Sequence, residues 1–501
     1  MTDERVSADL LGRATVPSTA VSVSGALACA DAGAIARAAL DVAIAGRGDA
    51  ALMEAIATLV THDTDGLDGA FVSAVACLRV LPDHSGLRAA LPVARCLDVV
   101  AHGIAGRQQR SPPLATDVLA LEAFALTLAQ LPDTAATLAS DAAAAELAVR
   151  RVALGDVEPG AIAEEVVDLL YLRAGRCAHL APIVLATVQV ARVAERAVAV
   201  DALARTARTL VLRGLPRNAA FEDVVTPIVA SALRIHGAQD PDKAGAFQEA
   251  RFRPHLLGAK PDVLVRAVGK ALAFGVPRGR VASSLCLAAA ERVLRFDAAI
   301  ARSARRQETW LDMGWLLQIC EAIRTLGVLH DRPGWLALLL HGALWTRAAS
   351  PLDAATPQAL PEPETLARTW DHGPEIARVT GAMLRGDGRA AMAVLRGYLM
   401  MVLPEQPLSA EIASAALEDR AASAAEQGAL LATVVAALAS FGAAAGLPHR
   451  DLLLCAALHV WTAPQPPRAV FALAHAEVDR AEGALPADTT SVLPWLAHRP
   501  T

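Results

Sequence analysis

Two carboxylates in a short polar stretch are the side chains of this sequence best suited to proton transfer. Glu308 and Asp312 are four residues apart, so on a helix both would project from one face. Tryptophans lie beside them, and a carboxyl group that loses water against an indole has a raised pKa. The pattern predicts an acid/base pair as the catalytic residues. The same stretch supplies three candidate substrate-binding residues: Trp310, Trp315 and Arg295.

The arginines of this stretch support a structural alternative. Arg295 and Arg306 could pair with the two acids, and amides at a helix end could bind them as well. Both carboxylates would then stay ionised and take no part in proton transfer. We expect this structural arrangement, with no cavity beside the acids.

The histidines and cysteines form no recognisable metal site in the sequence. Cys177 and His179 match C-x-H, the first half of a Rieske iron–sulfur pattern, but the second half, C-x-x-H, does not occur. Helical di-metal sites use Glu-x-x-His motifs, which are also missing. The seven cysteines are scattered and contain no C-x-x-C, which is typical of buried free thiols in a reducing cytoplasm. The sequence predicts no metal and no cofactor.

The elements that must position these residues are helices. Apolar residues recur at helical spacing and strict alternation is nearly absent. Apolar segments end repeatedly at a glycine followed by proline, a combination that closes one helix and prevents its continuation. These breaks occur at Gly214, Gly275 and Gly446, with a related one from Gly327 to Pro333. Because their spacing is uneven, the pattern predicts an all-α fold, an irregular stack of antiparallel helical hairpins without significant sheet.

Polar and proline-rich breaks divide the chain without long linkers. The predicted parts are a loose N-terminal arm (1–25), a helical body (26–347), a Pro-rich surface connection (348–364), a C-terminal helical part packed on the same body (365–482) and a tail (483–501).

Charge and hydropathy restrict the classes of partner. The net charge is −6 and the arginines alternate with acids, as on solvated helix faces, so nucleic acid is not a predicted partner. The uncharged run 427–449 is long enough to span a membrane, but Gly442, Gly446 and Pro448 interrupt its second half. We therefore expect a buried helix and a turn there, no membrane association, and a cytoplasmic location, because the first residues lack the order of a signal peptide.

Three stretches resemble a known family. Residues 267–312 contain A-L-A-F-G-V-P, A-A-A-E-R-V-L-R-F-D and E-T-W-L-D, and residues 81–113 and 452–483 have similar apolar motifs. Together they resemble the large helical domain of bacterial Rieske-associated proteins, which precedes a separate Rieske 2Fe-2S domain. The resemblance implies a redox-related helical fold over nearly the whole chain, with the Rieske domain itself missing.

The positions that carry histidines in that family hold other residues here. The segment 168–176 matches D-H-x-Y-L-D-x-G-H, with Leu169 and Arg176 in place of the histidines and Arg173 in place of the second aspartate. Trp315 and Ser423 occupy two further histidine positions. None of these side chains replaces imidazole as a metal ligand. The resemblance therefore implies a relative that has lost the family's metal site.

Two functions follow from the sequence. The first is a partner or scaffold subunit, working with a paralogous or redox protein and not itself a metal enzyme. The second is a metal-free tailoring oxidoreductase or acid/base enzyme that acts on an apolar small molecule held between helices. Replacement of the matched histidines favours the first. Retention of four acids keeps the second open: Asp168, Asp297, Glu308 and Asp312.

Overall fold

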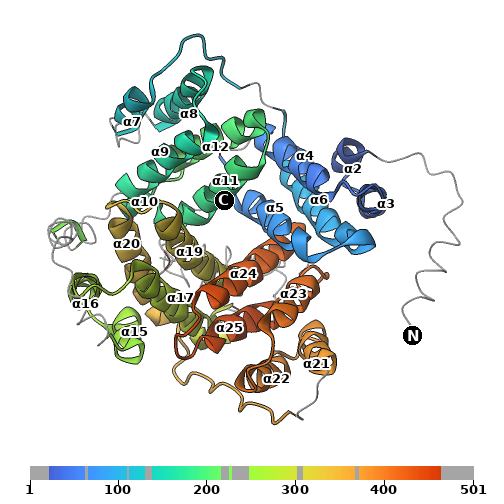
Figure 1. The fold of residues 1–501 in the computed structure, drawn as a ribbon, viewed down its shortest axis with the longest axis vertical. Helices are drawn as coiled ribbons and strands as arrows, with labels where there is room; N and C mark the ends of the chain where they lie inside the picture. The colour runs from blue at the N-terminus through green and yellow to red at the C-terminus, as the bar shows by residue number, and fades with distance from the viewer. Residues whose placement is uncertain are drawn as a thin grey trace, which may run out of the picture.

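The fold is a stack of helices (Figure 1). The computed structural model describes residues 22–62, 66–109, 112–129, 138–215, 225–227, 247–301, 308–366, 372–421, 423–463 and 493. Within these ranges there are 22 α-helices and four short 3-10 helices, and the only β-type pairing is two isolated bridges, His62 with Gln109 and Phe296 with Asp353. The predicted all-α fold is confirmed.

The N-terminal half supplies two groups of helices. The first group is α2 (Val23–Cys29), α3 (Ala32–Ile44), α4 (Gly48–Thr61), α5 (Gly69–Val80) and α6 (Ala90–Ile104). The second group is α7 (Leu121–Ala129), α8 (Leu138–Leu154), α9 (Pro159–Leu172), α10 (Ala174–Cys177), α11 (Ala181–Val193) and α12 (Arg196–Leu212). Helix α2 begins inside the segment predicted as a loose arm.

The second half supplies two more groups. They are α15 (Glu249–Gly258), α16 (Pro261–Ala273), α17 (Arg278–Arg295), α18 (Ala298–Ala301), α19 (Trp310–Leu329) and α20 (Trp335–Ala348), followed by α21 (Gly373–Leu384), α22 (Gly388–Met400), α23 (Glu405–Ala415), α24 (Ala424–Ala443) and α25 (Asp451–Thr462). The 3-10 helices are η1 (Leu81–Asp83), η2 (Gly86–Ala89), η3 (Ala178–Leu180) and η4 (Ser350–Leu352).

Four helices from different parts of the chain surround the middle of the molecule. Helix α5 packs on α24, α24 on α19, α19 on α11, and α11 on α5, which closes a ring of contacts (Figure 1). Close approach within the ring depends on small residues. A Cβ atom at Gly314 of α19 would lie 2.5 Å from the Thr433 hydroxyl of α24, and one at Gly428 of α24 would lie 2.7 Å from Ser73 of α5.

Two of the glycines predicted to separate helices, Gly275 and Gly446, lie between helices in the structure. Gly275 separates α16 from α17 at φ +76°, and Gly446 separates α24 from α25 at φ +80°, left-handed conformations that glycine adopts without strain. Gly214 follows the end of α12, and residues 216–224 lie outside the described ranges. The break predicted from Gly327 to Pro333 is present, because α19 ends at Leu329 and α20 begins at Trp335. Gly327 itself lies within α19, where Trp335 packs against it.

The most apolar segments of the described chain are largely buried inside the protein. Two described stretches, Ala174–Val193 and Ala424–Ala443, are long and apolar enough to cross a membrane, and 78% and 67% of their apolar windows are buried inside the protein. All seven cysteines are free, and six of them are buried, whereas Cys29 at the end of α2 is exposed.

Candidate functional site

Asp312 is bound to the start of its own helix. It is the third residue of α19, and its Oδ2 accepts hydrogen bonds from the backbone N–H and the hydroxyl of Thr309, both at 2.7 Å. The two residues form a capping box, in which side chains satisfy the free groups of a helix N-terminus. Asp312 is 1% exposed, and its arrangement matches the structural alternative.

Glu308 is equally buried, at 1% exposure, and lies two residues before the first turn of α19. Neither of the two pockets described below is lined by Glu308 or Asp312. Arg306, one of the predicted partners of these acids, lies outside the described residues.

The predicted substrate-binding residues have separate surroundings. Trp310 packs edge-to-face against Phe296 and His459, with ring centroids 4.7 Å apart in both pairs. The indole N–H of Trp315 donates to the backbone carbonyl of His179 at 3.2 Å. The two tryptophans of α19 therefore contact different neighbouring segments.

Arg295 belongs to an ion-pair network of α17. It bonds to Glu291 one turn earlier, and its Nη1 lies 3.9 Å from Asp353. Neighbouring Arg292, 1% exposed, also pairs with Asp353 and donates from Nε to the carbonyl of Thr346 at 3.0 Å. The network connects α17 to the segment after α20, so Arg295 has a structural role of its own.

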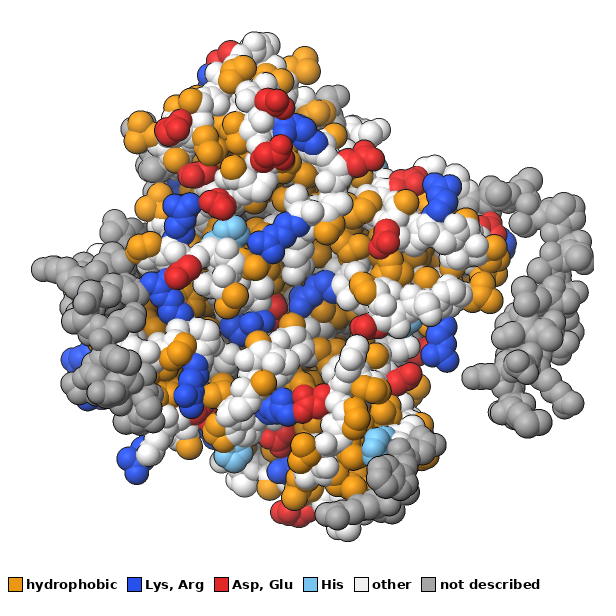
Figure 2. Space-filling model, viewed as in Figure 1, with side chains coloured by type: hydrophobic (Ala, Val, Ile, Leu, Met, Phe, Trp, Pro, Cys, Tyr) orange, Lys and Arg blue, Asp and Glu red, His pale blue; other side chains and the backbone are white. Residues whose placement is uncertain are grey.

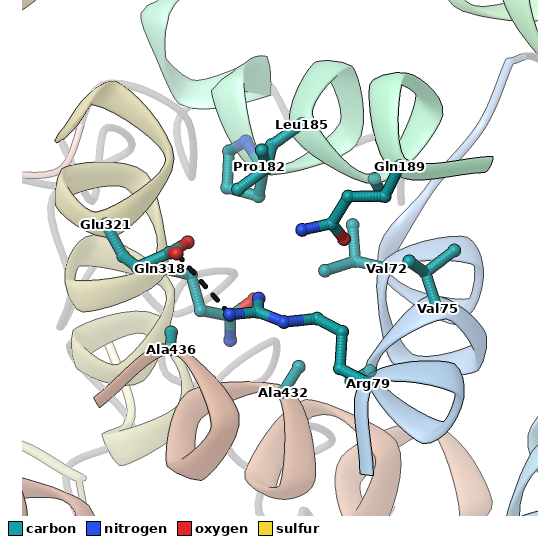
Figure 3. Close-up of a pocket in the computed structure, with 12 residues that line it drawn as sticks. Val72, Val75, Arg79, Pro182, Leu185, Gln189, Gln318, Glu321, Ala432 and Ala436 are labelled. Carbon is teal, nitrogen blue, oxygen red and sulfur yellow. Dashed lines mark ion pairs between the residues drawn. The ribbon is translucent and has the colours of Figure 1, made fainter. Parts of the chain in front are cut away.

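A polar pocket lies inside the ring formed by α5, α11, α19 and α24 (Figure 3). We call it the central pocket. The space inside it is small, about 20 Å³, which is enough for about one water molecule. Its polar side chains are Arg79, Gln189, Gln318 and Glu321. Its remaining walls are apolar and small: Val72, Val75, Ala76, Pro182, Leu185, Ala186, Ala432 and Ala436.

Gln318 presents an unused acceptor at the central pocket. Its Nε2 donates to the Thr433 hydroxyl at 3.0 Å and to the Ala429 carbonyl at 3.4 Å. Because Thr433 gives its own proton to that carbonyl at 2.8 Å, its oxygen can only accept from Gln318, which fixes the orientation of the amide. The opposite atom, Oε1, is buried without a hydrogen-bond partner among the described residues, although Gln318 is only 3% exposed.

Arg79 and Glu321 form a loose ion pair across the central pocket (Figure 3). Arg79 Nη2 lies 3.6 Å from Glu321 Oε1, and Arg324 Nη2 lies at the same distance from that oxygen. The hydroxyl of Thr325 also donates to Oε1 at 2.9 Å. Glu321 is 3% exposed and held on several sides, whereas the Arg79 side chain is 28% exposed. Arg79 makes no hydrogen bond within the described part of the chain.

The charged side chains that line a second pocket pair with one another. Its space is also about 20 Å³, and its lining includes Glu146, Arg150, Asp201 and Arg205. Arg150 lies 2.6 Å from Asp201 and 3.6 Å from Glu146, and Arg205 donates to the carbonyl of His62 at 3.3 Å. Nε of Arg150 is also buried there without a hydrogen bond among the described residues, but Arg150 pairs with two acids. The central pocket is the candidate considered further, because its unsatisfied atom, Oε1 of Gln318, belongs to an uncharged side chain without an ion-pair partner.

Acids and a histidine also gather where α9 meets the end of α19. Arg332 lies 3.1 Å from Glu164 and 3.8 Å from Asp168. Burial raises the pKa of Asp168 and lowers the pKa of His330, so loss of water affects both groups. No group of three or more His, Cys, Asp or Glu residues in the described ranges could hold a metal ion.

The residues of the central pocket were not predicted from the sequence. Arg79, Gln189 and Gln318 are more than a hundred residues apart, and only the packing of three helices brings them together. One local signal exists: Gln318 and Glu321 are polar residues three apart, on one face of an otherwise apolar segment.

Comparison with protein families, with curated proteins and with solved structures found no match to this chain.

Proposed function

We propose that this protein acts by binding, as a helical partner or scaffold subunit, and that the central pocket holds its ligand. The observation that carries the proposal is the buried Oε1 of Gln318, which has no partner among the described residues. A buried acceptor without a hydrogen bond costs about 1–3 kcal/mol, and a ligand that donates to it recovers this free energy. The loose Arg79–Glu321 pair provides a charged contact at the same place.

The surroundings of the predicted acid/base pair also favour binding over catalysis. Oδ2 of Asp312, one of the pair, accepts two hydrogen bonds at a helix end. Glu321 is not one of the predicted pair, but it is the acid that lines the central pocket, and it is held by two arginines and a threonine hydroxyl. The resemblance to Rieske-associated domains, with Leu, Arg, Trp and Ser at histidine positions, supports a redox or paralogous protein as the partner of a subunit without its own metal site.

A fragment screen with a matched pair of variants tests the proposal. Ala436→Leu adds three carbon atoms to the wall of the central pocket, whereas Ala425→Leu adds them on the exposed face of the same helix. Ligand-observed NMR with a chemically diverse fragment library should give compounds that bind the unchanged protein and Ala425→Leu but not Ala436→Leu. Circular dichroism checks that both variants fold. A library in which no compound is sensitive to Ala436→Leu contradicts the proposal.

The second candidate is the metal-free tailoring oxidoreductase or acid/base enzyme acting on an apolar small molecule. Its candidate catalytic residue is Glu308, which is 1% exposed. The variant Glu308→Gln distinguishes the binding protein from the enzyme. In a binding protein the change lowers the free energy of unfolding and leaves fragment affinity unaltered. Turnover of any compound that Glu308→Gln abolishes would favour the enzyme.

A further inference from the structure

We infer that the outer face of α7 and α9 docks a partner protein that presents a basic, amphipathic helix. The inference rests on the proposed role as a partner subunit and names the chemistry of the partner. We call this surface the α7–α9 face. It consists of acids and leucines from the two helices: Glu122 and Leu126 of α7, and Glu164, Glu165, Asp168 and Leu172 of α9.

The acids of the α7–α9 face repel one another. Burial raises the pKa of Glu165, and the negative charges of Asp168 and Glu164 on the same helix raise it further. The charge of Glu122 acts in the same direction, as expected of two helices that pack together. Arg332 lies 3.1 Å from Glu164 and 3.8 Å from Asp168 and offsets part of this repulsion. The side chains of Glu122 and Glu165 form no ion pair in the described part of the chain, so the face keeps an excess of negative charge.

Large apolar side chains are exposed on the same two helices. Leu172 is 64% exposed and follows Asp168 by four residues, so it continues the stripe of acids along α9. Leu126 is 59% exposed and follows Glu122 by four residues on α7. Fifteen large hydrophobic side chains are exposed among the described residues, and five of them belong to α7, α8, α9 and the segment just before α7. In Figure 2, acidic and hydrophobic side chains lie beside one another over this part of the molecule. Such a concentration of exposed apolar side chains marks an interaction surface.

Charge and spacing identify the partner. An excess of carboxylates selects lysine or arginine and disfavours acids, because like charges brought together cost free energy. The exposed leucines require apolar side chains beside those bases. On each helix an acid and a leucine are four residues apart, which is the spacing at which one face of an α-helix repeats its side chains. A basic amphipathic helix meets all three requirements.

Fluorescence anisotropy with labelled peptides tests this chemistry on the full chain. The first peptide is a short helix of leucine and lysine with the leucines on one face, the second contains lysine alone, and the third replaces each lysine of the first with glutamate. We expect the leucine–lysine peptide to bind about tenfold more tightly than oligolysine, and the leucine–glutamate peptide not to bind. Equal binding of the first two peptides overturns the inference, because the apolar side chains would then contribute nothing.

Removal of the two unpaired acids tests the position of the site. Glu122→Gln/Glu165→Gln should weaken binding of the leucine–lysine peptide about fivefold. Asp49→Asn/Glu54→Gln is the matched control, because it removes two exposed acids of α4 that form no ion pair within the described ranges and changes the net charge equally. It should leave the affinity unchanged. An equal loss in both double variants contradicts the inference, since the peptide would then respond only to the net charge of the protein.

Urea unfolding distinguishes a docking role of these acids from a structural one. Burial and the neighbouring acids oppose the charge of Glu165, so Glu122→Gln/Glu165→Gln should be at least as stable as the unchanged chain at neutral pH. A structural role would make the double variant less stable, and a loss of stability together with the loss of binding overturns the inference.

Leucine substitution tests the apolar part. Leu172→Gln should lower the preference for the leucine–lysine peptide over oligolysine about threefold. Ile44→Gln is the control, because Ile44 is similarly exposed, at 62%, but lies on α3. It should leave the preference unchanged. A preference that Leu172→Gln does not alter contradicts the placement of the partner on α9.

The outcomes separate the docking surface from the proposed function. If fragments sensitive to Ala436→Leu are found and no peptide depends on the α7–α9 face, the docking surface is wrong and the proposed function stands. If the leucine–lysine peptide depends on the face and no fragment depends on the central pocket, the docking surface stands and the pocket is not the ligand site. If neither dependence is found, both proposals are wrong.

Discussion

Buried polar side chains in this protein differ in how fully their hydrogen-bonding atoms are used. Arg292 bonds to Asp353 and to two backbone carbonyls, and Asp312 accepts two hydrogen bonds at a helix start. Gln318 uses its N–H groups and leaves its oxygen without a partner in the described part of the chain. Residue type alone does not show whether a buried polar side chain is fully hydrogen-bonded. For that reason the sequence analysis selected Glu308 and Asp312 as candidates and did not select Gln318.

Removing the cap of α19 should reduce stability without affecting ligand binding. Asp312→Ala is expected to lower the free energy of unfolding by about 1–2 kcal/mol, because the Thr309 N–H and hydroxyl lose their acceptor. Urea unfolding measures this effect. Asp49→Ala is the control, since Asp49 is an exposed acid in the first turn of α4 without a capping bond, and it should change stability by only a few tenths of a kcal/mol. A loss of fragment binding in Asp312→Ala would contradict the structural role.

A buried histidine predicts how stability depends on pH. Burial lowers the pKa of His341 on α20 to about 4, from an ordinary value of 6.5. Between these values the unfolded chain takes up a proton that the folded chain excludes, so stability is present above this window and is lost as the pH falls through it. His341→Gln should reduce the difference in unfolding free energy between about pH 7 and about pH 4.5 by up to about 3 kcal/mol.

Part of the acid sensitivity should remain in this variant, because burial also lowers the pKa of His459. His102→Gln serves as the control, since that ring is half exposed on α6 and stays in contact with water in both states. An unchanged pH dependence in His341→Gln would show that other groups control acid unfolding.

Helices and their ends were the most predictable elements. Gly275 and Gly446 follow the ends of helices and have a left-handed backbone conformation. This conformation is a local property, and the proline two residues later predicts it. Gly327 differs from them in sequence, because the next proline, Pro333, comes six residues later and not two. It lies inside α19, where a Cβ atom would be 2.3 Å from the indole of Trp335, so its small size serves the packing of α19 on α20. The distance to the next proline is the sequence signal that separates Gly327 from Gly275 and Gly446, whereas its contact with Trp335 is visible only in the folded structure.

Substitution of Gly327 should therefore strain this contact. Gly327→Ala is expected to lower the free energy of unfolding by about 1–3 kcal/mol, although alanine is the better helix former. The indole cannot shift freely, since Trp335 is 1% exposed and its Nε1 donates to the carbonyl of Ile323 at 2.7 Å. Gly279→Ala in α17 is the matched control, because no atom lies within 4 Å of its Cβ, and it should be neutral or slightly stabilising in urea unfolding.

The central pocket is a property of the whole molecule. Its walls come from α5, α11, α19 and α24, so no single helical hairpin contains it. Local apolar spacing predicts that each helix exists and which face is buried, but the choice of neighbour depends on how side chains fit over large distances in sequence. For that reason the all-α class was predictable from the sequence, and the meeting of Arg79 with Glu321 was not.

The same packing predicts that the two helical parts do not fold separately. Helix α24, after the predicted connection at 348–364, packs on α5 and α19, and α25 packs on α17. The contacts are close, with Gly428 against Ser73 and Gly314 against Thr433. Residues 1–347 produced alone would expose these apolar faces to water, which costs roughly 25 cal/mol for each Å². We expect this fragment to bind a hydrophobic dye and to unfold without a cooperative transition in urea.

Co-production with residues 348–501 provides the control, because it returns α24 and α25 without restoring the chain connection. The two fragments should associate into a soluble complex that unfolds cooperatively and again binds the fragments that depend on the central pocket. If residues 1–347 alone unfold with the midpoint of the intact chain, the N-terminal part is an independent domain. In that case the N-terminal part would fold without the pocket wall that Ala432 and Ala436 of α24 contribute.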